Sequence, residues 1–309
     1  MKTIKVSVLE IITCLGDEII NTNGDITDVY IDNLADAQHV NETTLDWVNP
    51  SKQDKQNIAE SSPAKVVLTD DTVIYSDSMR LQQKVLLHVK KPRLAMIKVA
   101  YQFFLEKQKP GVHPTAVIDA EAVIDNTAHI GAGCVIGKAS IGADTVLMPN
   151  VVVYDDVKIG DRCLIQAGAV IGTDGLGCSR DAEGRLTKFP HLGGVVIGND
   201  VEIGANCQIA RGALSDTVIK DGCKMNGLCF IAHNCVLEEN VWITGDTMLC
   251  GSCHVGKNAT IFSDVIIRDQ RTIGKGAQIG MGAVVVKNIP DGETWLGNPA
   301  HKVEKNNNR

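Results

Sequence analysis

The stretch "IKDGCKMNGLCFIAHNCVLEENVWITGDTML", residues 219–249, has an apolar residue at every sixth position. The same spacing continues to residue 285 and gives twelve consecutive apolar positions: Ile219, Met225, Ile231, Leu237, Ile243, Leu249, Val255, Ile261, Ile267, Ile273, Ile279 and Val285. A period of six matches neither the 3.6-residue turn of an α-helix nor the two-residue alternation of a β-strand. It is the hexapeptide repeat of a parallel β-helix, in which each coil contains three short strands and three turns.

The repeat extends toward the N-terminus and is interrupted twice. A run over residues 112–171 keeps the period of six except for a slip of one residue between 136 and 141, and a short third run follows at 197–209. Between 171 and 197 the chain carries a long insertion, and four extra residues stand between 209 and 219. Because insertions in a solenoid form loops on one face, these two segments are the expected places for functional loops.

The cysteines share one position of the repeat. Seven of the ten lie four residues after an apolar repeat residue: Cys134, Cys163, Cys207, Cys223, Cys229, Cys235 and Cys253. The tightest pair, Cys250 and Cys253, is the best candidate for a metal site or a disulfide. The shared position instead favours free thiols that pack as small apolar side chains, so we predict no metal site.

Residues 1–110 lack the repeat and form a separate α/β domain. "SPAKVVLTDD" and "KVLLHVKK" predict strands, and "KPRLAMIKVAYQFFLEK" predicts an amphipathic helix with Pro92 in its first turn. Residues 111–303 form the β-helix, with a loop insertion at 172–196, and we expect residues 304–309 to be a frayed tail.

Composition narrows the class of protein. The net charge of −7 argues against the basic face that nucleic-acid binding requires. The start of the chain has no apolar signal segment and no stretch is long enough to span a bilayer, so we expect a cytoplasmic protein without membrane insertion.

His233 interrupts the aliphatic pattern in "FIAHN", residues 230–234. Three hexapeptides make one coil, so Gly251, Asp269 and Lys287 should stack on the same column at the strand spacing of about 4.8 Å. An imidazole beside a backbone N–H that no side chain covers is a minimal acyl-transfer site, with a base and an oxyanion donor. Spacing alone favours the simpler interpretation, that His233 is one outward-facing polar residue among many.

Three stretches resemble the UDP-3-O-acylglucosamine N-acyltransferases of lipid A synthesis: "LMPNVVVYDDVKIGDRCLIQAGAVIGTDGLG", "KFPHLGGVVIGNDVEIGANCQIARGAL" and "FIAHN". The resemblance spans most of the chain and includes "LDWVNP" near the start. It implies a left-handed β-helix and a homotrimer with sites between subunits. It also implies that His233 is the general base and that Gly251 donates an oxyanion N–H.

The resemblance further implies residues that bind the sugar nucleotide. Asn234 would orient the sugar, and Asp174 and Gly175 in "GTDGLG" would cradle it, although these glycines could instead serve a flexible hairpin. Trp47 and Asn49 would contact the nucleotide base, with Trp47 either stacked on a pyrimidine or half-buried in the core.

The chain departs from that family at several positions. Gln270 stands where a second histidine is usual near the acyl-carrier arm, and Lys52 stands where a tyrosine is usual. The ending "IGMGAVVVKNIPDGETWLGNPAHKV" resembles hexapeptide acyltransferases that use coenzyme A. This second resemblance implies an acyl-donor site formed by Lys287, Gly297, Asn298 and Pro299, and the position of Gln270 near the acyl-carrier arm adds Gln270 to it.

We therefore expect an enzyme that transfers an acyl group from acyl-CoA to the amine of a nucleotide-linked amino sugar in cell-surface polysaccharide synthesis. Acyl-CoA acts as a cosubstrate, and no cofactor is permanently bound. The main alternative is the acyl-carrier-protein-dependent UDP-3-O-acylglucosamine N-acyltransferase itself. A metal-dependent hydratase would need several histidine ligands on one face, and a purely structural solenoid would leave the insertions unexplained.

Overall fold

The computed structural model describes residues 4–303. The chain divides into two compact units, Met1–Lys107 and Gln108–Arg309, a few residues before the boundary expected at 110. The segment expected to be a frayed tail, 304–309, lies outside the described residues.

The N-terminal unit is an α/β domain built on a four-stranded sheet. In chain order its elements are β1 (Val6–Ser7), α1 (Val8–Leu15), a 3₁₀ turn (Gly16–Glu18), β2 (Ile19–Asn23), β3 (Tyr30–Ile31), β4 (Leu45–Trp47), α2 (Lys55–Ser61), β5 (Val66–Thr69), α3 (Asp77–Leu81), β6 (Val85–Val89), α4 (Pro92–Val99) and a π-helical turn (Ala100–Phe104). The sheet order is β2-β6-β5-β4, and β1 pairs with β3 separately. The expected strands are β5 and β6. The expected helix is α4, which begins at Pro92, where its missing N–H costs nothing.

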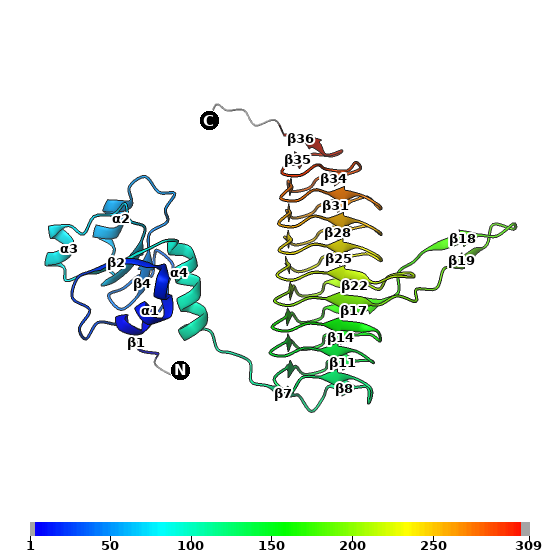
Figure 1. Ribbon diagram of the computed structural model, residues 1–309, viewed down its shortest axis with the longest axis horizontal. Helices are drawn as coiled ribbons and strands as arrows, with labels where there is room; N and C mark the ends of the chain where they lie inside the picture. Colours follow the sequence, from blue (N-terminus) through cyan, green and yellow to red (C-terminus); the bar gives the residue numbers. More distant parts are fainter. Residues whose placement is uncertain (1–3, 304–309) are drawn as a thin grey trace. The chain divides into compact units, whose positions relative to one another are not determined.

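Helices cover both faces of this sheet. Val66 and Leu68 of β5 pack in one apolar cluster with α1 and α4. Val67, between them, packs in a second cluster with residues of α2 and α3. Successive side chains of a strand point to opposite faces, so the sheet is the middle of three layers. Figure 1 shows these elements.

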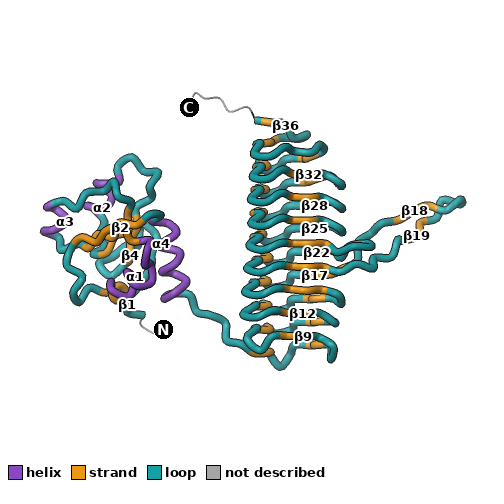
Figure 2. The backbone as a smooth tube through the Cα atoms, viewed as in Figure 1, coloured by secondary structure: helices purple, strands orange, loops and turns teal. Residues whose placement is uncertain are grey.

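The C-terminal unit is a parallel β-helix with three sheets. The first sheet contains β7 (Gly111–Val112), β10 (His129–Ile130), β13 (Val146–Leu147), β16 (Leu164–Ile165), β21 (Glu202–Ile203), β24 (Lys224–Met225), β27 (Trp242–Ile243), β30 (Thr260–Ile261), β33 (Gln278–Ile279), β35 (Thr294–Leu296) and β36 (His301–Lys302). The second contains β8 (Val117–Ile118), β11 (Val135–Ile136), β14 (Val152–Val153), β17 (Val170–Thr173), β22 (Gln208–Ala210), β25 (Phe230–Ile231), β28 (Met248–Leu249), β31 (Ile266–Ile267) and β34 (Val284–Val285). The third contains β9 (Val123–Ile124), β12 (Ser140–Ile141), β15 (Val157–Ile159), β20 (Val195–Ile197), β23 (Thr217–Ile219), β26 (Val236–Leu237), β29 (His254–Val255) and β32 (Thr272–Ile273). Figure 2 shows these short strands stacked coil on coil and joined by turns. The predicted solenoid is confirmed.

The strand pairing reproduces the spacing read from the sequence. Ile231 pairs with Leu249, and Leu249 pairs with Ile267, so every third repeat residue stacks on the one before it. The slip near residue 136 makes one coil shorter than these, because Ile136 pairs with Val153.

Both insertions leave the pairing of the repeat residues intact, although a β-bulge follows Ile171 in β17. Ile171 pairs with Ile209, so the whole of the long insertion belongs to the single coil between them. Ile209 pairs with Ile231, so the short insertion belongs to the next coil. The long insertion contains the antiparallel hairpin β18 (Cys178–Arg180) and β19 (Leu186–Lys188), which projects from the stack in Figure 1.

The interior of the coil is apolar and narrow. The repeat residues from Ile130 onward are buried, and the seven cysteines of the shared position are each at most 1% exposed, which confirms that they pack inside. Burial raises the pKa of the Cys223 thiol to about 11, so it stays protonated at neutral pH. All ten cysteines are free thiols. Within residues 4–303, no cluster of three or more histidine, cysteine or acidic side chains could hold a metal ion.

Asparagine and aspartate occupy the sharp turns. Asn234, Asn240, Asp246, Asn258 and Asp264 all have φ near +60°. Their short polar side chains tolerate this left-handed conformation better than other non-glycine residues do. The turn residue comes three positions after each buried aliphatic residue, so the repeat specifies the corners as well as the core. Among residues 4–303 no helix is long and apolar enough to cross a membrane.

Truncating one buried repeat residue tests this packing. Ile243 is fully buried, whereas its neighbour Trp242 is 53% exposed on the outer surface. We expect Ile243→Ala to lower the free energy of unfolding by about 2–5 kcal/mol, because the rigid coil cannot collapse into the cavity. Urea denaturation followed by circular dichroism measures the loss, and Trp242→Ala is the matched control. An equal or larger loss for the control would contradict the inward assignment of the repeat.

Candidate functional site

His233 lies in the turn after β25, beside the next coil of the β-helix. Its side chain is half-buried, and its backbone carbonyl accepts the N–H of Ser252 at 2.9 Å. The pairing of Ile231 with Leu249 and of Leu249 with Ile267 brings Gly251 and then Asp269 into the column of His233, as the length of the coil predicted. The ring therefore lies against a backbone segment one strand spacing away.

Gly251 is in direct contact with the imidazole. A Cβ added at Gly251 would lie 2.6 Å from both Cε1 and Nε2 of His233, which is far inside van der Waals contact. Only glycine allows the ring this position. Within residues 4–303 the N–H of Gly251 donates to no group, while its carbonyl accepts the N–H of Gln270 at 2.9 Å. The structure thus brings the predicted base and the predicted donor together.

Asn234 sets the protonation pattern of the His233 ring. Its side-chain Oδ1 accepts the backbone N–H of Ala213 at 3.0 Å, and its Nδ2 donates to the carbonyl of Ser215 at 2.9 Å. These two bonds fix which end of the amide is oxygen. Nδ1 of His233 is 3.1 Å from that oxygen, so Nδ1 must carry the hydrogen. Nε2, the nitrogen that faces Gly251, then keeps its lone pair and can accept a proton.

The same hydrogen bonds indicate what Asn234 does in the absence of a substrate. Both ends of its amide are engaged with residues 213–215 and with His233, so its contacts are those of a residue that positions the ring. An uninterrupted repeat would place Ser215 in the column of His233. Ser215 contacts Asn234 instead, because the short insertion displaces it from that column.

The long insertion contributes the other wall of the site. A Cβ at Gly175 would lie 3.1 Å from Cδ2 of His233, so this glycine also lies close to the ring. Asp174 is exposed and paired with Lys188 of β19. The lysine holds the pKa of the Asp174 carboxyl below its ordinary value, so the residue is an anion at neutral pH.

A residue without a predicted role completes this wall. His191 is 6% exposed, and its ring meets that of His233 edge to face, with centroids 5.3 Å apart. The sequence gives no periodic signal for this contact, because the insertion lies outside the repeat. The only available signal is the presence of a histidine in a loop already expected to be functional.

The predicted nucleotide-binding residues lie in the N-terminal unit. Trp47 of β4 is half-buried and packs against the cluster formed by α1, α4 and the sheet. The side-chain oxygen of Asn49 accepts the N–H of Ser51 at 3.0 Å. These contacts explain the local structure of both residues without a ligand.

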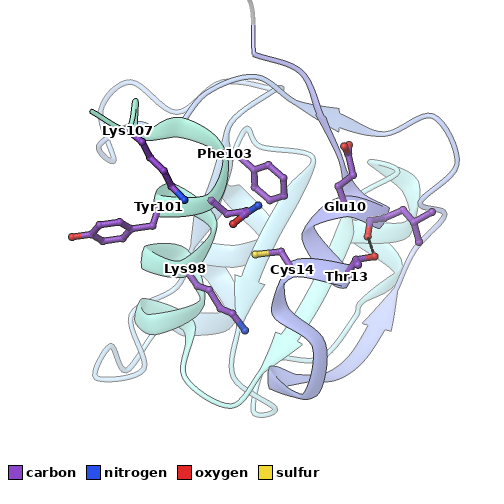
Figure 3. Close-up of a pocket in the computed structure, with 9 residues that line it drawn as sticks. Glu10, Thr13, Cys14, Lys98, Tyr101, Phe103 and Lys107 are labelled. Atoms are coloured by element: carbon purple, nitrogen blue, oxygen red, sulfur yellow. Dashed lines mark hydrogen bonds between the residues drawn. The ribbon is translucent and has the colours of Figure 1, made fainter. Parts of the chain in front are cut away.

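A depression of about 740 Å³ lies elsewhere in the same unit. It is bordered by Glu10, Cys14, Lys98, Tyr101 and Phe103, which belong to α1, α4 and the following π-helical turn, as Figure 3 shows. Neither of the two predicted nucleotide-binding residues lines it.

The predicted acyl-donor residues follow the column of His233 toward the end of the β-helix. Gln270 is exposed in the turn after β31, beside Gly251, and Lys287 is exposed three coils beyond His233. The turn from Gly297 to Pro299 is held on the last coil, where the Gly297 carbonyl accepts the N–H of Val284 at 3.1 Å. Asn298 and Pro299 are exposed and joined by a cis peptide bond. No hydrogen bond or ring contact joins any of these five residues to the imidazole.

Comparison with known proteins places the chain among acyltransferases. A family model described as bacterial transferase hexapeptide (six repeats) matches residues 138–173. A UDP-3-O-acylglucosamine N-acyltransferase from Bordetella pertussis is 34% identical over 275 residues, which are 81% of this chain and 75% of that protein. The chain belongs to this family.

Other relatives match over a shorter span. A UDP-3-O-acylglucosamine N-acyltransferase from Coxiella burnetii is 37% identical over 161 residues, so the chain spans only about half the length of that relative, 47%, and the match covers 46% of this chain. Among solved structures, the UDP-N-acetylglucosamine acyltransferase of Francisella novicida has 26% identity and a TM-score of 0.58 over 63% of this chain and 71% of its own. The predicted resemblance to this family is confirmed.

The tautomer of His233 can be tested directly. We expect Asn234→Gly to raise the population of the Nε2–H tautomer, because the variant loses the oxygen that accepts the Nδ1–H. Glycine suits the left-handed turn, where Asn234 has φ +59°. ¹⁵N NMR of labelled histidine rings measures the ratio of the two tautomers. Asn258→Gly is the matched control, since Asn258 has φ +60° in an equivalent turn. Equal ratios in both variants would show that Asn234 does not set the tautomer.

Proposed function

We propose that this protein is an N-acyltransferase that acylates the amine of a UDP-linked amino sugar. The observation that carries the proposal is the contact between the His233 ring and Gly251, whose N–H donates to no group within residues 4–303, while Asn234 leaves the lone pair of the ring on Nε2. A base and an oxyanion donor at one point of the surface are what the aminolysis of a thioester requires.

The reaction follows from the positions of these groups. The sugar amine attacks the thioester carbonyl, and a C–N bond forms while the carbonyl oxygen becomes an oxyanion that the Gly251 N–H stabilises. Nε2 of His233 takes one proton from the nitrogen. The C–S bond then breaks, and the protonated imidazole returns its proton to the leaving thiolate, which departs as the thiol.

The names of the relatives indicate which sugar accepts the acyl group. They favour UDP-3-O-acylglucosamine, and therefore the lipid A alternative, over the acyl-CoA interpretation of the C-terminus. Acyl carrier protein and coenzyme A present the thioester on the same phosphopantetheine arm. In either case we propose that the arm follows the surface from Gln270 past Lys287 to the turn at Gly297, Asn298 and Pro299. Asp174 and Gly175 lie at the sugar end, and Trp47 and Asn49 are proposed for the nucleotide.

We also propose that the enzyme acts as a homotrimer in the cytoplasm. The outward positions of the second sheet form a nearly unbroken apolar column: Val117, Val135, Val152, Val170, Gln208, Phe230, Met248, Ile266 and Val284. Val117 is 64% exposed, Met248 is 42% exposed and Ile266 is 43% exposed. A contiguous apolar strip of this length on a surface is typical of a protein interface. His233 follows β25 of this sheet, so a neighbouring copy would border the site.

Assays with both donors test the acyl-transfer proposal. We expect purified protein to acylate UDP-3-O-acylglucosamine, with acyl carrier protein as the preferred thioester donor over coenzyme A. His233→Ala should lower kcat by about 10²–10⁴-fold, the range for a lost general base. His254→Ala is the matched control, because His254 lies on the third sheet and bonds Glu238. Near-normal turnover by His233→Ala would point to a substrate-assisted route, and a preference for acyl-CoA would restore the other interpretation.

The interface is tested by placing a charge on the apolar column. We expect Ile266→Glu to shift the protein from trimer toward monomer, since the carboxylate would lose its hydration in the contact. Sedimentation velocity measures the mass of the assembly. Thr272→Glu, on the outward surface of the third sheet, is the control and should leave the trimer intact. A monomeric wild-type protein, or an unchanged trimer for Ile266→Glu, would refute the proposed interface.

A further inference from the structure

His191 is an imidazole of the site for which the reaction above has no use. It follows the hairpin strand β19 in the long insertion and is 6% exposed. Its ring is inclined at 72° to that of His233, with centroids 5.3 Å apart. Rings whose centroids lie this close are in contact, so a ligand atom that reaches one ring also lies near the other.

The hydrogen bonds of His191 define which of its nitrogens is free. Nδ1 is 3.1 Å from the carbonyl oxygen of Phe189, which can only accept, so Nδ1 carries the hydrogen. Nε2 then has a lone pair. This nitrogen is buried, and among residues 4–303 it has no hydrogen-bond partner. Buried polar atoms are almost always paired, because leaving one unpaired costs free energy. The unpaired Nε2 calls for a donor that comes from outside the chain.

The free nitrogen is directed to the place where the insertion meets the catalytic ring. A Cβ at Gly175 would lie 2.5 Å from Nε2 of His191 and 3.1 Å from Cδ2 of His233. Both rings thus converge on this one glycine, and any larger residue would fill the space between them. Leu176, the next residue, is 80% exposed, so the insertion is open to solvent beside Gly175. A ligand atom that enters between the rings has to displace Gly175.

We infer that Nε2 of His191 accepts the second N–H of the substrate amine and thereby selects an amine over a hydroxyl. This inference rests on the proposed acyl transfer. An attacking amine carries two hydrogens on its nitrogen, whereas a hydroxyl carries one on its oxygen. His233 removes one proton as the C–N bond forms and passes it to the thiolate as the C–S bond breaks. The other hydrogen stays on nitrogen and becomes the amide N–H of the product.

The two imidazoles have the same tautomer and different roles. In each, a local oxygen accepts the Nδ1–H: Asn234 Oδ1 for His233 and the Phe189 carbonyl for His191. In each, Nε2 is left as an acceptor. A hydroxyl nucleophile would satisfy His233 and leave the lone pair of His191 unpaired, and an unpaired buried acceptor is a penalty that disfavours the hydroxyl substrate.

The experiment compares the amine with a hydroxyl analogue in wild-type protein and in His191→Phe. Phenylalanine keeps an aromatic ring and removes both nitrogens. The probes are UDP-3-O-acylglucosamine and the same molecule with a hydroxyl in place of the amine. Isothermal titration without any acyl donor should show about tenfold weaker binding of the amine by the variant, the value of one lost hydrogen bond. Binding of the hydroxyl analogue should change by no more than about twofold.

Turnover supplies the second readout. With donor present, kcat/KM for the amine should fall by roughly 10–100-fold in His191→Phe, while slow acylation of the hydroxyl analogue persists. His254→Phe removes an imidazole from the third sheet and should behave as wild type on both probes. The inference alone would be overturned if the wild-type protein is active but His191→Phe weakens the binding of both probes equally, or of neither. Failure of the wild type to bind either probe would overturn it together with the proposed function.

Discussion

The fold depends on the hydrogen-bonded pairing of each coil with the coil before it. Parallel pairing sets successive coils one strand spacing apart, about 4.8 Å, and the narrow interior admits an aliphatic residue at one position and a small residue a few positions later. A fully buried isoleucine or leucine contributes about 1.5–3 kcal/mol through its removal from water. Because the contribution repeats in every coil, the stack is stabilised along its whole length without a large central core.

The same constraint makes the β-helix suitable for a catalytic pair. The strand register, which many coils fix, keeps two residues one coil apart in contact. No flexible loop has to become ordered to bring them together. His233 and Gly251 meet in this way, and the missing side chain at Gly251 leaves room for the ring. A general base and an oxyanion donor act best when their positions are set before the substrate arrives. The rigidity that stabilises the fold therefore also serves the chemistry proposed for it.

Sequence periodicity predicted the features that the hexapeptide repeat determines. The strands, the inward cysteines and the contact of His233 with Gly251 all follow from counting hexapeptides and coils. The role of Asn234 could not be derived in this way, since its amide bonds to Ala213 and Ser215, in the short insertion that breaks the period. His191 lay outside prediction for the same reason. A long inserted loop can reach many points on a surface, and only the folded structure decides which point it reaches.

The two insertions work together at one corner of the β-helix. The side chain of Arg211, in the short insertion, donates to the carbonyl of Gly193 at 2.6 Å, at the end of the long one. The same guanidinium pairs with Asp156 at 2.8 Å, on the coil beneath. In a regular coil each outward side chain points away from the axis of the β-helix, so it cannot fold back over the outer surface of the coil. A loop that returns to the coil can do so, and here it brings an imidazole to the face that the stacked residues leave open. The regular part of the chain thus supplies the position of the base, and the irregular part supplies the groups that surround it.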